Sequence, residues 1–168
     1  MTHRETPATG AHGLGISAGA FVAAFTASPT PMVLTDPRQH DNPIVWANEA
    51  FLSLTGYAWE EISGRNCRML QGPETDPRAV RRLRDAVIAG RPIEIELVNY
   101  RKDGTSFWNG MTVAPVHDET GQIVHFYSAQ ADMTGKYRTE VAMKDAHDEL
   151  ERRVGEQTAH LRAALEQK

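Results

Sequence analysis

Cysteine is nearly absent from the chain: Cys67 is the only one among 168 residues. A single thiol excludes the internal disulfides of a small secreted domain. Long apolar runs are missing as well, because no segment approaches the ~20 apolar residues of a membrane-spanning helix and the N-terminus lacks the core of a signal peptide. The net charge of −4 offers no basic surface for nucleic acid or an anionic membrane. These absences predict a cytoplasmic protein without a membrane or nucleic-acid partner.

The sequence motifs of common enzymes are missing too. There is no CxxC and no His/Cys/Asp spacing typical of zinc, so no metal site is predicted. A GxSxG elbow, a Walker loop and a GxGxxG turn are also absent. A Cys–His nucleophile pair would need His117 or His125 beside Cys67, and both lie at or near the ends of expected strands, which favours surface positions. From the residues alone, an inert buried thiol is the commonest outcome for Cys67.

The N-terminal part divides into two segments. Residues 1–15 are polar and rich in Gly, Thr and Ala, which predicts a flexible leader. Residues 16–28 predict a short cap helix that is stopped by the prolines at 29 and 31, with Phe21, Val22 and Phe25 on one side. This apolar side needs a partner, either the core of the same chain or a second subunit.

Residues 29–134 carry the pattern of one α+β domain. Strands are expected at 31–36 and 43–48, followed by three short helical segments and a clear helix at 76–90. In that helix Asp76 is a suitable cap, Pro77 suits the first turn, and Val80, Leu83 and Val87 share one face. Apolar alternation then predicts three strands at 93–101, 106–117 and 123–132, joined by the turns KDGT and DETGQ. This order favours a single antiparallel sheet.

Residues 135–168 predict a charged helix with a weak heptad seam. The seam positions alternate in steps of three and four and consist of His147, Leu150, Val154, Gln157, Leu161 and Ala164. A dimeric coiled coil is favoured, and the alternative is one solvated amphipathic helix. The helical pattern reaches Lys168 without a cap, which favours a fragment of a longer protein or a protein that ends in its signalling helix.

The stretch GRNCRMLQG at 64–72 resembles the GRNCRFLQG signature of the light–oxygen–voltage (LOV) domains, a branch of the PAS superfamily. The likeness extends over about residues 30–134 and includes TDPRQHDNPIVWANEAFLSLTGY, NYRKDG, FWNG and the late Gln130. It implies a PAS fold, namely a five-stranded antiparallel sheet with short helices on one face, together with an N-terminal helix and a C-terminal coiled-coil helix.

The resemblance also implies a blue-light photoreceptor that holds a flavin non-covalently between the sheet and the short helices. Flavin mononucleotide (FMN) is the family's usual cofactor, and FAD or riboflavin is less favoured. In such domains light excites the flavin, the cysteine sulfur bonds reversibly to flavin carbon C4a, and flavin N5 gains a proton. Cys67 is the matching residue, and Gln130, which would face N5, is the matching signal switch.

Further cofactor-binding residues follow from the same resemblance. Arg68 and Arg84 match the family's phosphate-binding arginines. Without the family motif, Arg84 would be interpreted as a solvated charge on a helix surface. The amide positions are Asn66, Gln71, Asn99, Asn109 and Gln130. The cavity walls would be formed by Val33, Thr35, Leu70, Val80, Leu83, Val87, Met111, Val113 and Phe126; each such residue type is more often plain core, and most would serve both roles. Met69 and Met111 stand where the family usually has phenylalanine, which predicts a changed adduct lifetime rather than lost binding.

The route to an output is implied as well. Gln130 would change its hydrogen bonding, and the last strand would pass this change through DMT to the C-terminal helix. That helix resembles the linker before the dimerisation helices of sensor histidine kinases, which implies a homodimer through the N-terminal and C-terminal helices and a downstream kinase or effector. No phosphoacceptor motif or ATP-binding domain is present, so this chain itself is predicted not to be an enzyme. The alternatives are a flavin-based redox sensor and a PAS interaction module without photochemistry.

Overall fold

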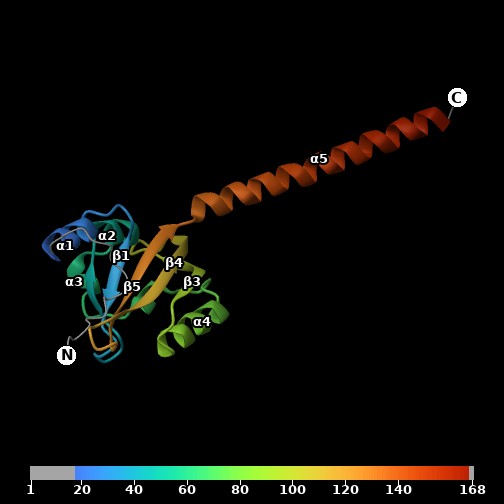
Figure 1. Cartoon of the computed structure of the whole chain (residues 1–168). Coiled ribbons are helices and arrows are strands. Elements are labelled where there is room, and N and C mark those ends of the chain that lie inside the picture. The colour runs from blue at the N-terminus through green and yellow to red at the C-terminus, as the bar shows by residue number, and fades with distance from the viewer. Residues whose placement is uncertain (1–17, 167–168) are drawn as a thin grey trace, which may run out of the picture.

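The computed structural model describes residues 18–166, which form a five-stranded sheet with helices packed on it and one long C-terminal helix (Figure 1). The leader expected at 1–15 and the last residues, 167–168, lie outside the described residues. The strands are β1 (Met32–Thr35), β2 (Ile44–Ala47), β3 (Ile93–Tyr100), β4 (Ser106–His117) and β5 (Ile123–Asp132).

Every neighbouring pair in the sheet is antiparallel, and the strand order is β2-β1-β5-β4-β3. The first strand therefore lies beside the last one, with Met32 opposite Ala129 and Thr35 opposite Phe126. Pairs such as β3 with β4 and β4 with β5 are joined by short turns, as the alternation predicted. The expected α+β class with one antiparallel sheet is confirmed.

Three of the described helices begin at a residue whose side chain caps them, and the sequence marks one of these residues, Asp76. Their bounds are α1 (Ala18–Thr26), α2 (Glu49–Thr55), α3 (Trp59–Ile62), a 3₁₀ helix η1 (Cys67–Leu70), α4 (Pro77–Ile88) and α5 (Thr134–Glu166). Asp76 caps α4 by accepting a hydrogen bond from the Arg78 amide, and Pro77 occupies the first turn. Asn66 caps η1 in the same way through the Arg68 amide, so Cys67 opens this helix.

Two groups of buried side chains form the core. One consists of residues from β1, β2 and the first helices, namely Val33, Ile44, Phe51, Ile62 and Leu70. The other lies between α4 and β3 and contains Ala79, Ile95 and Leu97. Members of both groups line the cavity described below, which therefore lies between two parts of the core rather than at its edge.

Helix α5 is attached to the sheet only at its start. The Trp108 amide on β4 donates to Thr134 Oγ1, and the rings of Trp108 and Tyr137 stack with centroids 4.4 Å apart. Tyr137 also donates a hydrogen bond to the Glu96 carboxylate on β3. Farther along, α5 projects away from the sheet (Figure 1), and its seam residues Leu150 and Val154 are 60% and 53% exposed. An apolar seam left in water favours a partner helix.

None of the helices between residues 18 and 166 is both long and apolar enough to cross a membrane.

The side chain of Asn48 links the turn before β1, the start of β1 and the first turn of α2. Its side-chain nitrogen donates to the carbonyls of Thr30 at 2.8 Å and Ser28 at 3.2 Å. Its side-chain oxygen accepts from the amides of Met32 at 2.9 Å and Phe51 at 3.0 Å. The residue is 1% exposed, so water cannot replace these bonds.

We expect Asn48→Ala to lower the free energy of unfolding by about 2–4 kcal/mol, because it leaves several buried backbone groups unpaired. The matched control is Asp76→Ala, which removes a cap at the solvent-exposed start of α4 and should cost about 1 kcal/mol. Chemical denaturation of both variants measures the difference. Equal losses in the two variants would contradict a central role for Asn48.

Candidate functional site

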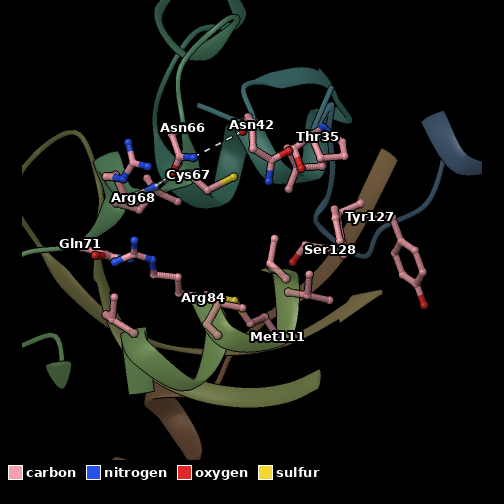
Figure 2. A pocket seen from close by; sticks show the side chains of 18 of the residues that line it. Thr35, Asn42, Asn66, Cys67, Arg68, Gln71, Arg84, Met111, Tyr127 and Ser128 are labelled. Carbon is pink, nitrogen blue, oxygen red and sulfur yellow. Dashed lines mark hydrogen bonds between the residues drawn. The ribbon is translucent and has the colours of Figure 1, made fainter. Parts of the chain in front are cut away.

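A cavity of about 690 Å³ lies between the inner face of the sheet and the elements η1 and α4 (Figure 2). This volume falls within the range of small-molecule and cofactor sites. All cofactor residues predicted from the sequence line it except Asn109; they are Val33, Thr35, Asn66, Cys67, Arg68, Leu70, Gln71, Val80, Leu83, Arg84, Val87, Asn99, Met111, Val113, Phe126 and Gln130. Met69 packs against the first core group and does not line the cavity.

The segment that carries Cys67 is fixed to β3 at and beyond its C-terminal end. Asn99 on β3 donates from its side chain to the Leu70 carbonyl at 3.1 Å. Farther on, a side-chain carbon at Gly72 would lie only 2.3 Å from the Tyr100 ring, so that ring leaves room for glycine alone. The Tyr100 hydroxyl also accepts a hydrogen bond from the Glu74 amide. The glycine that closes GRNCRMLQG thus lets β3 hold η1 in place.

The thiol of Cys67 is directed into the cavity (Figure 2). Burial raises the pKa of this thiol to about 12 and outweighs two smaller opposing effects, a backbone hydrogen bond and the positive charge of Arg68. The sulfur therefore carries its proton at neutral pH. Among residues 18–166, no group of three or more His, Cys, Asp and Glu side chains is placed to hold a metal ion.

A row of buried amides crosses three strands beneath the cavity. The Asn109 side-chain nitrogen donates to Asn99 Oδ1 at 2.9 Å and to Gln130 Oε1 at 2.8 Å. All three side chains are at most 5% exposed. The predicted cofactor-binding role of Asn109 stays a prediction; the structure places its side chain between these two neighbours, outside the cavity lining. The reason is the strand order, because β4 lies between β3 and β5.

Three buried side-chain oxygen atoms have no hydrogen-bond partner within residues 18–166: Asn42 Oδ1, Ser128 Oγ and Asn109 Oδ1. Such atoms cost about 1–3 kcal/mol each unless a partner is supplied. Asn42 and Ser128 line the cavity, and Figure 2 shows the Ser128 oxygen directed into it. The cavity therefore fits a ligand that carries polar groups of its own.

Sequence reasoning missed both Asn42 and Ser128. For Ser128 a signal was available, because alternation along β5 places Phe126, Ser128 and Gln130 on one face. Asn42 lies in the loop between β1 and β2, where no periodic pattern marks an inward side chain. The other lining residues that were missed are Pro37, Gln39, Asp41, Ile88, Leu97 and Tyr127.

One end of the cavity is cationic. Arg68 reaches it from η1 and pairs with both oxygens of the Asp41 carboxylate at 2.5 Å. Arg84 reaches it from α4, and Figure 2 shows its guanidinium on the side of Arg68 and Gln71. Arg84 forms no ion pair with any residue in the described part of the chain. Guanidinium groups with free donors suit a phosphate or carboxylate.

Comparison with known proteins agrees with this geometry. A family model described as a PAS domain matches residues 29–135. A blue-light-activated histidine kinase of Brucella anthropi is 46% identical over 136 residues, which are 80% of this chain and 28% of that protein. The chain thus spans little more than a quarter of the curated relative's length.

Two solved structures are similar along nearly their whole length. A LOV domain from work on a flavin analogue and the LOV mechanism has 40% identity and a TM-score of 0.67, with 77% of this chain and 96% of that chain covered. The LOV domain of a blue-light activated histidine kinase from Erythrobacter litoralis has 39% identity and a TM-score of 0.62, with 64% and 98% covered. The chain therefore belongs to the PAS domain family and, within it, to the light–oxygen–voltage domains.

Proposed function

We propose that this chain is a blue-light sensory module that binds a flavin in the cavity and uses Cys67 as the light-reactive group. The observation that carries the proposal is the single protonated thiol directed into a cavity that also presents buried amides and cationic side chains. The relatives named for blue-light activation support the same function.

The residues present suit FMN in particular. Asn99 and Gln130 would meet the polar edge of the flavin ring, while Ser128 and Asn42 offer the unpaired atoms that the ligand can satisfy. Arg84 and Arg68 would hold the terminal phosphate at the cationic end. The apolar walls that would enclose the ring are Val33, Thr35, Leu70, Val80, Leu83, Val87, Met111, Val113 and Phe126. Met69 and Met111 both stand where the family usually has phenylalanine, and of these two only Met111 lines the cavity. We therefore assign to Met111 any effect on the adduct lifetime.

When bound, the flavin supplies the absorption of blue light and a ring carbon that takes the Cys67 sulfur, while a ring nitrogen takes the thiol proton. The chain's part is to keep that proton on sulfur in the dark and to hold the sulfur over the cavity through η1. The raised pKa of Cys67 also argues against a redox sensor, because peroxide-sensing thiols are low-pKa thiolates.

Gln130 connects the cavity to the output helix. Its side-chain oxygen accepts from Asn109, and its backbone amide donates to the Pro31 carbonyl at 2.9 Å. β5 ends at Asp132, and α5 begins at Thr134. A reoriented Gln130 amide would change the bond to Asn109 and, with it, the strand that leads directly into α5.

We further propose that the chain forms a homodimer through the α5 seam, with a contribution from α1, where Val22 is 62% exposed. The output is proposed to be a histidine kinase, because relatives of this chain carry that name. In this arrangement the chain senses light, and catalysis belongs to a separate kinase domain.

Blue illumination should bleach the flavin absorption band reversibly in the wild type and leave it unchanged in Cys67→Ala, because the variant lacks the reacting sulfur. Absorption spectra of both proteins, taken dark, after illumination and during recovery, measure this. Both proteins should carry flavin in the dark, since Cys67 is not needed to hold it. Equal bleaching of the two would exclude Cys67 as the reacting group, and a colourless wild type would exclude the photoreceptor.

The dark reaction of Cys67 with iodoacetamide should be slow and should accelerate about tenfold per pH unit between pH 7 and 10. Only the thiolate reacts, and a pKa near 12 keeps its fraction small and rising throughout this range. At pH 8 the folded protein should react on the order of a hundredfold more slowly than the unfolded chain, whose thiol has an ordinary pKa. Mass spectrometry measures the rates. A plateau near pH 9 in the folded protein would contradict the raised pKa.

Gln130→Leu should retain the reversible bleaching but lose the light-induced change in α5, because leucine cannot exchange a hydrogen bond with the flavin or Asn109. Hydrogen exchange of residues 134–150, measured dark and illuminated, reports on the helix. The matched control is Gln122→Leu, in the exposed turn before β5, which should respond to light like the wild type. A normal α5 response in Gln130→Leu would exclude this route.

A further inference from the structure

Asp41 closes one side of the cationic end of the cavity. Its two carboxylate oxygens accept hydrogen bonds from the two terminal nitrogens of Arg68. Both residues line the cavity, and their side chains are 42% and 58% exposed. The charge of Arg68 is thus already matched by a carboxylate that belongs to the chain itself.

The backbone holds this carboxylate in place. Asp41 and Asn42 both have left-handed conformations, with φ of 69° and 47°, and no other described residues besides glycines have a positive φ. The Asn66 side chain donates to the Asp41 carbonyl at 2.5 Å, so the loop is tied to the residue that precedes Cys67. The hydrogen bond from Arg68 lowers the pKa of Asp41, which is therefore ionised at neutral pH.

A phosphate at this end of the cavity would meet both signs of charge. Arg84 forms no ion pair in the described chain and would attract it. Arg68 would have to leave Asp41 or share its donors, and the Asp41 carboxylate would repel a dianion at short range. A flavin without a phosphate would meet neither effect.

From this arrangement we infer that Asp41 is a specificity-determining residue that reduces the preference of the cavity for phosphorylated flavin, FMN, over unphosphorylated flavin, riboflavin. The inference rests on the proposed function, because it assumes a flavin in this cavity. Asp41 acts in two ways, and both weaken the binding of FMN relative to riboflavin. It occupies the donors of Arg68, and it adds a negative charge beside the phosphate.

An exchange experiment tests the inference on the flavin-loaded protein. The protein is equilibrated in the dark with an excess of FMN and riboflavin in equal amounts, freed of unbound flavin, and heated to release the bound flavins for chromatography. We expect the bound FMN:riboflavin ratio to be up to about fivefold higher in Asp41→Asn than in the wild type, the size of one exposed charge interaction. Asparagine tolerates the left-handed backbone, so the loop is preserved. The gain should shrink in 1 M salt.

The control is Asp103→Asn, which makes the same charge change in the exposed turn between β3 and β4 and should leave the ratio unchanged. Asp41→Gly, unstrained at this φ, provides a second variant and should raise the ratio as Asp41→Asn does. An unchanged or lower ratio in both Asp41 variants would overturn the inference while leaving flavin binding intact. A wild type that retains neither flavin would overturn the proposed function and this inference with it.

Discussion

The inner face of the sheet carries three buried amides, Asn99, Asn109 and Gln130, at positions where a small domain ordinarily has apolar side chains. The rest of the site depends on the hydrogen bonds that these amides form. Asn109 bridges Asn99 and Gln130, so amides on β3, β4 and β5 are hydrogen-bonded to one another. Buried amides are destabilising unless they are paired. The three amides are hydrogen-bonded to their neighbours along the sheet. Asn99 and Gln130 also line the cavity, where a polar ligand can take up their remaining hydrogen-bonding capacity.

The same row also positions the thiol. Asn99 accepts from Asn109 and donates to the Leu70 carbonyl, so the sheet fixes the end of the short helix that Cys67 begins. Gly72 then lets the Tyr100 ring pack against the chain. The proposed light-driven bond formation would use a sulfur that is held in place and protonated in the dark. Burial provides the second property and the contacts of η1 with β3 provide the first.

The proposed response to light would have a short path out of this site. Gln130 is the last member of the amide row and lies on β5, four residues before α5 begins. The start of α5 is attached to the outer side chains Trp108 and Glu96, while most of the helix has no contact with the sheet. A helix that is anchored at one end and exposed along its apolar seam is suited to pass a small change at its root to a partner helix.

Local patterns in the sequence were sufficient for most of the elements. The alternation at 106–117 and 123–132 predicts strands with the bounds that β4 and β5 have, and Asp76 with Pro77 marks the start of α4. The family resemblance, which is strongest in GRNCRMLQG, singled out Cys67 and the other predicted cofactor residues. The fold brings nearly all of them around one cavity. The elements follow from the sequence because intrinsic backbone preferences and side-chain periodicity act over a few residues, whereas the cofactor residues were predicted from the family resemblance.

Tertiary structure decided what depends on partners distant in the chain. The place of β1 beside β5, the position of Asn109 between two other amides and the pairing of Arg68 with Asp41 join residues 10 to nearly 100 positions apart. No local pattern carries that information, because any arginine on a short helix is equally suited to a phosphate, a carboxylate or water. The sequence alone thus determined which chemical groups are present and on which elements, whereas the strand order and loop conformation decided which charges and amides meet.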